Sequence, residues 1–286
     1  MARTSDNTTG IVFDIGNESL STFPEIEHVV GINQKLIRLF GDQSTGIYLT
    51  GNGRATVSNS PTGEIVISIS KDMKKPGIGM YSDNPNGTIS NDRDPKYGYN
   101  GKITIDKNSI GMAGINGATV TNNAIIMIDT APNLVKEGRG IGMAGAKGAL
   151  VTNNASIFIS DDGGIGMFLA DGAKGFNKGV ITTLSRNDTL NPGNIINPIG
   201  VIGVYIGKNA QFSNEGGQII INSAGGTGIV VEEGGEIINR GTIQVNGGAI
   251  EEQKSNITIE IPKILDRKMP VKKDMRVYVD SLGETN

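Results

Sequence analysis

Short runs of alternating apolar and polar residues fill most of the chain, and a motif of the form apolar-Gly-apolar returns along it, with Thr as its first residue in two copies. The glycines of this motif are Gly46, Gly79, Gly111, Gly142, Gly166, Gly203 and Gly228. Consecutive motif glycines lie between 24 residues (Gly142 to Gly166) and 37 residues (Gly166 to Gly203) apart. A repeated unit of this length is typical of solenoid proteins, in which each unit packs on its neighbours.

Two further positions recur at fixed distances from the motif glycine in the last five repeats. The sixth residue after it is of a type that tolerates a left-handed backbone, which predicts a tight turn. The residues at this position are Gly117, Gly148, Gly172, Asn209 and Gly234. The eleventh residue is always Asn, as Asn122, Asn153, Asn177, Asn214 and Asn239. In the two earlier repeats the Asn shifts to Asn59 and Asn91.

Recurrence of Asn at one position indicates a physical role for its side chain. Asn tolerates the left-handed conformation of a tight turn, and its amide both donates and accepts hydrogen bonds. Asn side chains stacked in successive repeats can therefore bond to one another and to the turn backbone. We interpret the five residues as a structural Asn ladder rather than a ligand site. By the same recurrence, Met80, Met112, Met143 and Met167 are predicted to form a core column rather than a cofactor site.

Between these turns the apolar residues alternate, as Ile126 and Ile128 do, and Ile157 and Ile159 repeat the pattern. A period of two over a few residues predicts short strands with one buried face. Each repeat is therefore expected to form a strand, a Gly turn, a strand, an Asn turn and a third strand. This layout predicts an all-β fold, a right-handed parallel β-helix (β-solenoid) of about seven to eight coils, with equivalent strands about 4.8 Å apart.

The first part of the chain departs from the repeat. Residues 1–44 are expected to form an N-terminal cap and a degenerate first coil, with residues 29–32 as its apolar stretch. Residues 34–40 are predicted to form a capping helical turn. The β-helix repeats are assigned to residues 45–250.

The last part, residues 251–286, is predicted to be a linker rich in Pro and Lys that ends in a strand. Pro262 and Pro270 interrupt regular structure there, and residues 276–280 have the alternation of a strand. No aromatic residue interleaves the basic ones between these prolines, so a solvated linker is favoured over a nucleic-acid surface.

Repeats longer than the roughly 20 residues that one coil needs must release the surplus as loops. The main insertions are residues 92–100, 130–139 and 186–198. Most of them connect the third strand of one coil to the first strand of the next, so we expect them to lie along one edge of the solenoid. Insertions gathered on one edge often form the binding face of a repeat protein. Tyr97 and Tyr99 in the first loop are the candidate binding residues. The alternative is a loop that packs on its own coil.

Composition narrows the class of protein. The 286 residues include 42 Gly, no Cys and one His, with a formal net charge of −3. The absence of Cys excludes disulfides and thiolate chemistry, and the charge favours neither nucleic acid nor an anionic membrane. No stretch approaches the roughly 18 to 20 consecutive apolar residues of a membrane-spanning helix. The first residues also lack the apolar run of a secretory signal.

A search for catalytic chemistry yields no catalytic, cofactor-binding or metal-binding residue, and no cofactor is expected. His28 is the one imidazole, and no Ser motif accompanies it. Carboxylates are the remaining option, because β-helical polysaccharide enzymes place acidic side chains on an outer sheet face. The candidates are Asp129 and the pairs Asp161–Asp162 and Glu232–Glu233. Neighbouring residues on a strand point to opposite faces, so neither pair brings two carboxylates together.

The repeat resembles a known family. The unit from Ile110-Gly111-Met112 to Gly117-Ala118-Thr119-Val120-Thr121-Asn122-Asn123 is similar to the passenger repeats of large fusobacterial type V autotransporter adhesins. The unit that starts at Ile141 and residues 276–283 resemble that family too, so the likeness extends over about residues 45–286. The repeat motif is a specific indicator of the β-helix architecture, but it indicates function only weakly.

The resemblance implies a cell-surface, outer-membrane or secreted location, as part of a longer exported chain. It implies adhesion to a host-cell or bacterial surface protein or glycan, no nucleic-acid partner, and membrane attachment only through a translocator barrel that this chain lacks. We therefore expect an internal segment of an adhesin passenger, a structural β-helix stalk without catalysis. The alternatives are the non-catalytic stalk of a subtilisin-like protease autotransporter and a polysaccharide-processing β-helix enzyme.

Overall fold

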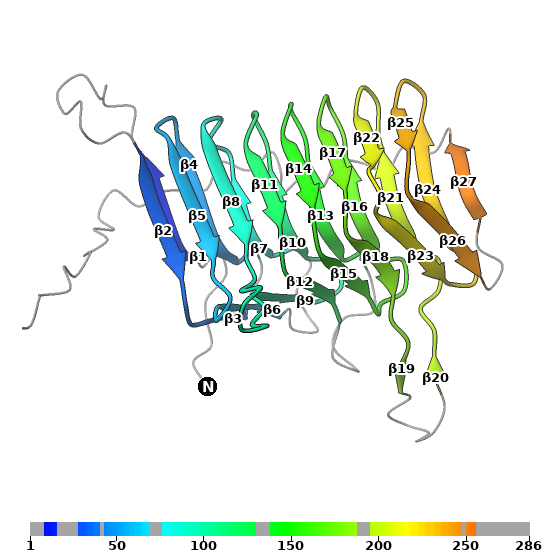
Figure 1. Cartoon of the computed structure of the whole chain (residues 1–286), viewed down its shortest axis with the longest axis horizontal. Helices are drawn as coiled ribbons and strands as arrows, with labels where there is room; N and C mark the ends of the chain where they lie inside the picture. Colours follow the sequence, from blue (N-terminus) through cyan, green and yellow to red (C-terminus); the bar gives the residue numbers. More distant parts are fainter. Residues whose placement is uncertain are drawn as a thin grey trace, which may run out of the picture.

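A computed structural model describes residues 9–15, 28–40, 43–68, 76–129, 138–187, 195–246 and 250–255. These residues form three long parallel sheets, here called A, B and C, and one short antiparallel strand pair. Each turn of the chain contributes one strand to A, the next to B and the next to C, and the coils stack side by side along the long axis of the molecule (Figure 1). The fold class is confirmed as a parallel β-helix, with eight complete coils in the described residues and one further strand in sheet A.

The strand bounds follow the repeat. Sheet A contains β1 (Thr9–Ile15), β4 (Thr45–Gly51), β7 (Ile78–Ser82), β10 (Ile110–Gly114), β13 (Ile141–Gly145), β16 (Ile165–Leu169), β21 (Ile202–Ile206), β24 (Thr227–Glu232) and β27 (Ile250–Ser255). Sheet B contains β2 (Val29–Asn33), β5 (Ala55–Asn59), β8 (Gly87–Asn91), β11 (Thr119–Asn122), β14 (Leu150–Asn153), β17 (Lys174–Asn177), β22 (Gln211–Asn214) and β25 (Glu236–Asn239). Sheet C contains β3 (Leu36–Phe40), β6 (Glu64–Ser68), β9 (Lys102–Ile105), β12 (Ile125–Ile128), β15 (Ser156–Ile159), β18 (Val180–Thr183), β23 (Gln218–Asn222) and β26 (Thr242–Asn246). The antiparallel strands β19 (Arg186–Asn187) and β20 (Ile195–Ile196) project away from the solenoid (Figure 1).

The ends of the solenoid differ from the sequence-based expectation. The helical turn predicted for residues 34–40 is wrong, because Leu36–Phe40 is strand β3, which pairs in parallel with β6. The coils also continue past residue 250, since β27 (Ile250–Ser255) pairs with β24. The linker and strand predicted for residues 256–286 lie outside the described residues.

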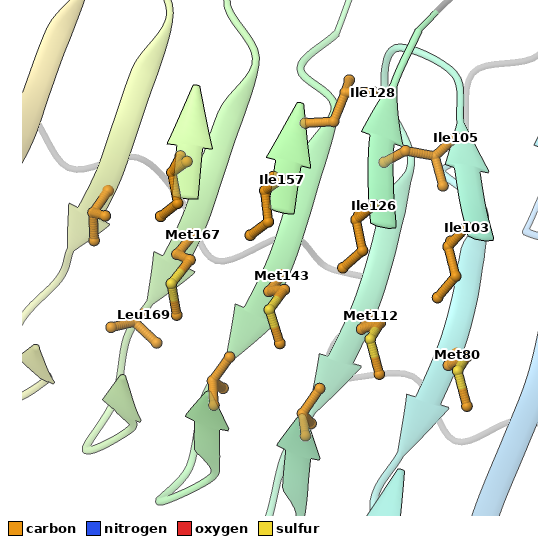
Figure 2. Close-up of a cluster of buried hydrophobic side chains, with 14 of the residues drawn as sticks. Met80, Ile103, Ile105, Met112, Ile126, Ile128, Met143, Ile157, Met167 and Leu169 are labelled. Carbon is orange, nitrogen blue, oxygen red and sulfur yellow. The ribbon is translucent and has the colours of Figure 1, made fainter. Parts of the chain in front are cut away.

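The interior of the coils holds the predicted apolar columns. Ile126 pairs with Ile157 and Ile128 with Ile159, and all four side chains are fully buried. The methionine column faces them across the coil, as Figure 2 shows for Met112 and Met143 beside these isoleucines. Identical residues therefore stack on identical residues from coil to coil, which explains why the repeat is so visible in the sequence.

The motif glycines of sheet A occupy positions where a side chain does not fit. A Cβ atom on Gly142 would lie 2.7 Å from the carbonyl oxygen of Gly166 in the next coil and 2.6 Å from the Cγ2 atom of Ile157. Gly111 has the same surroundings, with the Gly142 oxygen at 2.5 Å. The glycine column therefore lets the backbones of sheet A approach the isoleucines of sheet C.

From β4 to β24, sheet A is apolar on both faces, unlike the one buried face predicted from the alternation. Tyr48, Tyr81, Phe168 and Tyr205 lie on the face that points away from the coil interior, and each is at most 2% exposed. Tyr48 stacks on Tyr81 with ring centroids 5.4 Å apart, and Phe168 stacks on Tyr205 at 5.0 Å. Strands of parallel sheets with two buried faces read as continuous apolar runs, as the Ile-Gly-Met motif does.

The Tyr48 hydroxyl group donates a hydrogen bond of 2.7 Å to Asp83 Oδ2. Burial is the main reason why the pKa of Tyr48 is raised above its ordinary value, and the hydrogen bond to the Asp83 carboxylate raises it further. The phenol therefore stays protonated and keeps donating to Asp83 across the neutral range.

Candidate functional site

The Tyr97–Tyr99 loop, residues 92–100, is a compact turn at the corner between sheets B and C. It follows β8 and precedes β9. The other two predicted insertions lie between a strand of sheet C and the next strand of sheet A, as expected for most of the insertions, so this loop is the one at a different corner. Residues 130–137 and 188–194 of those insertions lie outside the described residues.

Asp94 organises the backbone of this loop. Its carboxylate accepts hydrogen bonds from the Lys96 and Tyr97 amides at 2.8 and 3.1 Å. Its own amide donates to the Tyr99 carbonyl at 2.8 Å, and the Gly98 amide donates to its carbonyl at 2.9 Å. A loop closed by four such bonds holds its side chains in a fixed arrangement.

The two tyrosine side chains point into solvent. Tyr97 is 63% exposed and Tyr99 58%, with ring centroids 6.4 Å apart. The Lys96 ammonium lies 4.9 Å from the centre of the Tyr97 ring, a cation–π distance. The loop therefore presents one positive charge and two tyrosine rings, and Tyr is enriched at the energetic centres of interfaces.

The predicted Asn residues and Asn33, which the repeat did not predict, form one unbroken column. Each side-chain amide before that of Asn239 donates to the Oδ1 atom of the Asn in the next coil at 2.8 to 3.0 Å. The members are Asn33, Asn59, Asn91, Asn122, Asn153, Asn177, Asn214 and Asn239. Some amides also donate to turn carbonyls, as Asn153 does to Ala155 at 3.1 Å. Because these bonds lie within the column and its turns, the geometry is that of a structural ladder.

The candidate carboxylates are spread over the molecule. Asp129 and Asp161 follow β12 and β15 at the corner between sheets C and A, whereas Glu232 ends β24 in sheet A. Asp162 accepts a hydrogen bond from the Ile199 amide at 2.8 Å. Glu232 accepts bonds from the Tyr205 hydroxyl and from a backbone amide. Within the described ranges, no group of three or more His, Asp or Glu side chains could hold a metal ion.

His28 and Glu233 also lie apart from these carboxylates. The His28 Nε2 atom lies 2.9 Å from the Thr56 Oγ1 atom at an exposed position beside sheet B. Glu233 is exposed in the turn after β24. The structure therefore does not bring the imidazole and the paired acids into one site.

A hollow on the outer face of sheet B was not predicted from the sequence. It has a volume of about 210 Å³ and lies over β17, β22 and β25. Phe176, Ser213 and Ile238 occupy the outward position directly before the ladder Asn, where the preceding coils carry Thr121 and Thr152. The exchange of Thr for an aromatic and an aliphatic residue at this position is the sequence signal that could have found it.

Residues 151–260 match the family model described as the third pectate lyase-like domain of BigA. This match starts in β14 and includes the coils that carry the sheet B hollow, and it agrees with the repeat motifs and the parallel coils. The chain resembles autotransporter passenger repeats. No curated protein matches the chain.

The solved structure of a TibA fragment that TibC has hyper-glycosylated aligns with 88% of this chain and with 100% of its own chain, at 13% identity and a TM-score of 0.17. Among the described residues of this passenger-like β-helix, no helix is long and apolar enough to span a membrane.

Proposed function

We propose that this β-helix is a segment of a surface-exposed autotransporter passenger that acts as an adhesin and stalk, and that the Tyr97–Tyr99 loop contacts the partner. The partner is a protein or glycan on a host or bacterial cell. The observation that carries the proposal is the exposure of both tyrosine rings on a closed loop. The large aromatic residues of sheet A, in contrast, are buried. A pre-ordered loop loses little conformational entropy when it binds.

The test is binding of the purified, fluorescently labelled full chain to cultured epithelial cells and to a panel of bacterial cells. The double variant Tyr97→Ser, Tyr99→Ser should reduce saturable binding by about tenfold, because truncation of an aromatic anchor typically removes more than 1 kcal/mol. Its melting temperature should match the wild type, because more than half of each tyrosine is exposed.

Ile199→Ser is the matched control, because Ile199 is 59% exposed and lies at a different corner of the solenoid. This variant should bind as the wild type does. Equal binding by the wild type and the tyrosine double variant would contradict the role of the loop. Absence of binding to every cell type would favour the alternative role as the stalk of a protease autotransporter.

The second candidate function is polysaccharide processing, which the pectate lyase-like description of the matched family favours. The scattered carboxylates speak against hydrolysis of a polysaccharide, because a glycosidase needs two carboxyl groups within about 5 to 10 Å across one sugar. Release of reducing ends from polygalacturonate or from neutral polysaccharides by the purified chain would support this second function.

A further inference from the structure

The hollow on sheet B has two apolar walls and a small residue between them. Phe176, Ser213 and Ile238 are in register on three consecutive strands, with their side chains on the outer face. Strands are about 4.8 Å apart, so the outer two backbones are separated by about 10 Å. A ring that contacts Phe176 on one side and Ile238 on the other needs about 4 Å for each contact, and the two distances together fit within the separation of the backbones. Ile238 is 52% exposed, so this wall is open to a ligand.

Polar side chains border the hollow on both sides of this row. Lys174, Gln211 and Glu236 lie on one side, and Gln211 Nε2 donates to Glu236 Oε2 at 2.8 Å. Glu215 and Arg240 lie on the other side. Both borders therefore offer hydrogen-bond donors and acceptors. Lys178 Nζ lies 3.6 Å from Glu215 Oε2, so charges of both signs surround the hollow.

We propose that this hollow binds a neutral pyranose residue of a glycan chain. A pyranose has an apolar face of C–H groups, which stacks on an aromatic ring such as Phe176, and an edge of hydroxyl groups, which bond to charged and amide side chains on both borders. A volume of about 210 Å³ suits one such ring. Charges of both signs on the borders favour a neutral sugar, because an acidic sugar would meet the Glu215 and Glu236 carboxylates as well as the cations.

A ring held between Phe176 and Ile238 lies across the solenoid axis, so its glycosidic bonds extend parallel to the strands and over the two polar borders. The site therefore accommodates an internal residue of a polysaccharide that crosses sheet B. This inference is independent of the Tyr97–Tyr99 loop, which lies in an earlier coil, so either proposal can fail alone.

The test is saturation-transfer difference NMR on the purified full chain. The probes are methyl β-galactopyranoside, methyl β-glucopyranoside and trigalacturonic acid. At least one neutral glycoside should give signals that are strongest for the ring C–H protons. Phe176→Ala and Ser213→Leu should each weaken its affinity by about fivefold or more, the first by removing a wall and the second by filling the hollow.

The matched control is Thr121→Ala, which alters the same outward row two coils before Phe176. It should leave the affinity unchanged. The melting temperature of each variant shows whether it is folded, so a loss of affinity in a folded variant can be assigned to the hollow. The proposal is overturned if neither neutral glycoside binds, if trigalacturonic acid binds more tightly than both, or if binding survives Phe176→Ala and Ser213→Leu in folded protein.

Discussion

Ile157→Ala should lower the free energy of unfolding by about 2 to 5 kcal/mol. Its side chain is fully buried, stacks between Ile126 and Ile181 in sheet C, and contacts the glycine column of sheet A. Truncation removes the transfer free energy of the side chain and leaves a cavity that rigid coils on both sides fill poorly. Denaturant unfolding, monitored by circular dichroism, measures the change.

Ser156→Ala is the control for this change, because Ser156 precedes Ile157 on β15 and faces outward. Its effect should stay within about 0.5 kcal/mol. If Ser156→Ala proved as damaging as Ile157→Ala, the two faces of β15 would be exchanged. A slip of one residue exchanges the faces of a whole strand, so the register would have to be redrawn.

Asn153→Ala should cost about 2 to 4 kcal/mol. The Asn122 amide donates to Asn153 Oδ1, and the Asn153 amide donates to Asn177 Oδ1, each at 2.9 Å. The substitution leaves a buried donor on one side and a buried acceptor on the other, and each unpaired group costs about 1 to 3 kcal/mol. Chemical denaturation of the purified variant gives the value.

The neighbouring residue provides a control for the ladder. Asn154 is exposed, and its amide donates to Asn123 Oδ1 at 2.8 Å on the surface. Asn154→Ala should therefore change stability by no more than about 0.5 kcal/mol. If Asn153→Ala and Asn154→Ala lowered the free energy of unfolding equally, the buried hydrogen bonds of the column would contribute no more to stability than the exposed one.

The central coils could be predicted from the sequence because equivalent positions in every coil have the same surroundings and require the same residue types. Coils that stack in register place equivalent residues beside one another, so the need for Asn at 122 returns at 153 and 177. Glycine is required where a Cβ atom would meet a backbone oxygen, as at Gly142. Such positions are fixed by geometry and therefore recur in the sequence.

The first coil was harder to predict because an insertion obscures its period. Thr9-Gly10-Ile11 repeats the motif Thr45-Gly46-Ile47, and the two strands are paired in register. Residues 16–27 then separate this motif from β2, so Asn33 does not fall eleven residues after Gly10. In β3, pairing with β6 overrides the weak helical preference of Leu and Arg.

The sheet B hollow could not be predicted from one repeat alone. Phe176, Ser213 and Ile238 are far apart in the chain, and each is unremarkable as a single outward residue. Only the register of three coils places a large, a small and a large side chain in one row. The width of the hollow depends on this juxtaposition.

Both the hollow and the ladder depend on the register in which coils stack, and a cysteine pair tests that register directly. The chain has no Cys, so an introduced disulfide has no competing partner. Thr121 on β11 is paired with Thr152 on β14, on the same outer face. Paired parallel strands bring Cα atoms within the roughly 4.4 to 6.8 Å that a disulfide needs.

The measurement is disulfide formation under mild oxidation in Thr121→Cys, Thr152→Cys, compared with Thr121→Cys, Val151→Cys, and read by mass spectrometry of the cleaved chain. The first pair should cross-link nearly completely. The second should stay reduced, because Val151 faces the core. Cross-linking of the second pair in preference to the first, or of neither, would contradict the stacked coils.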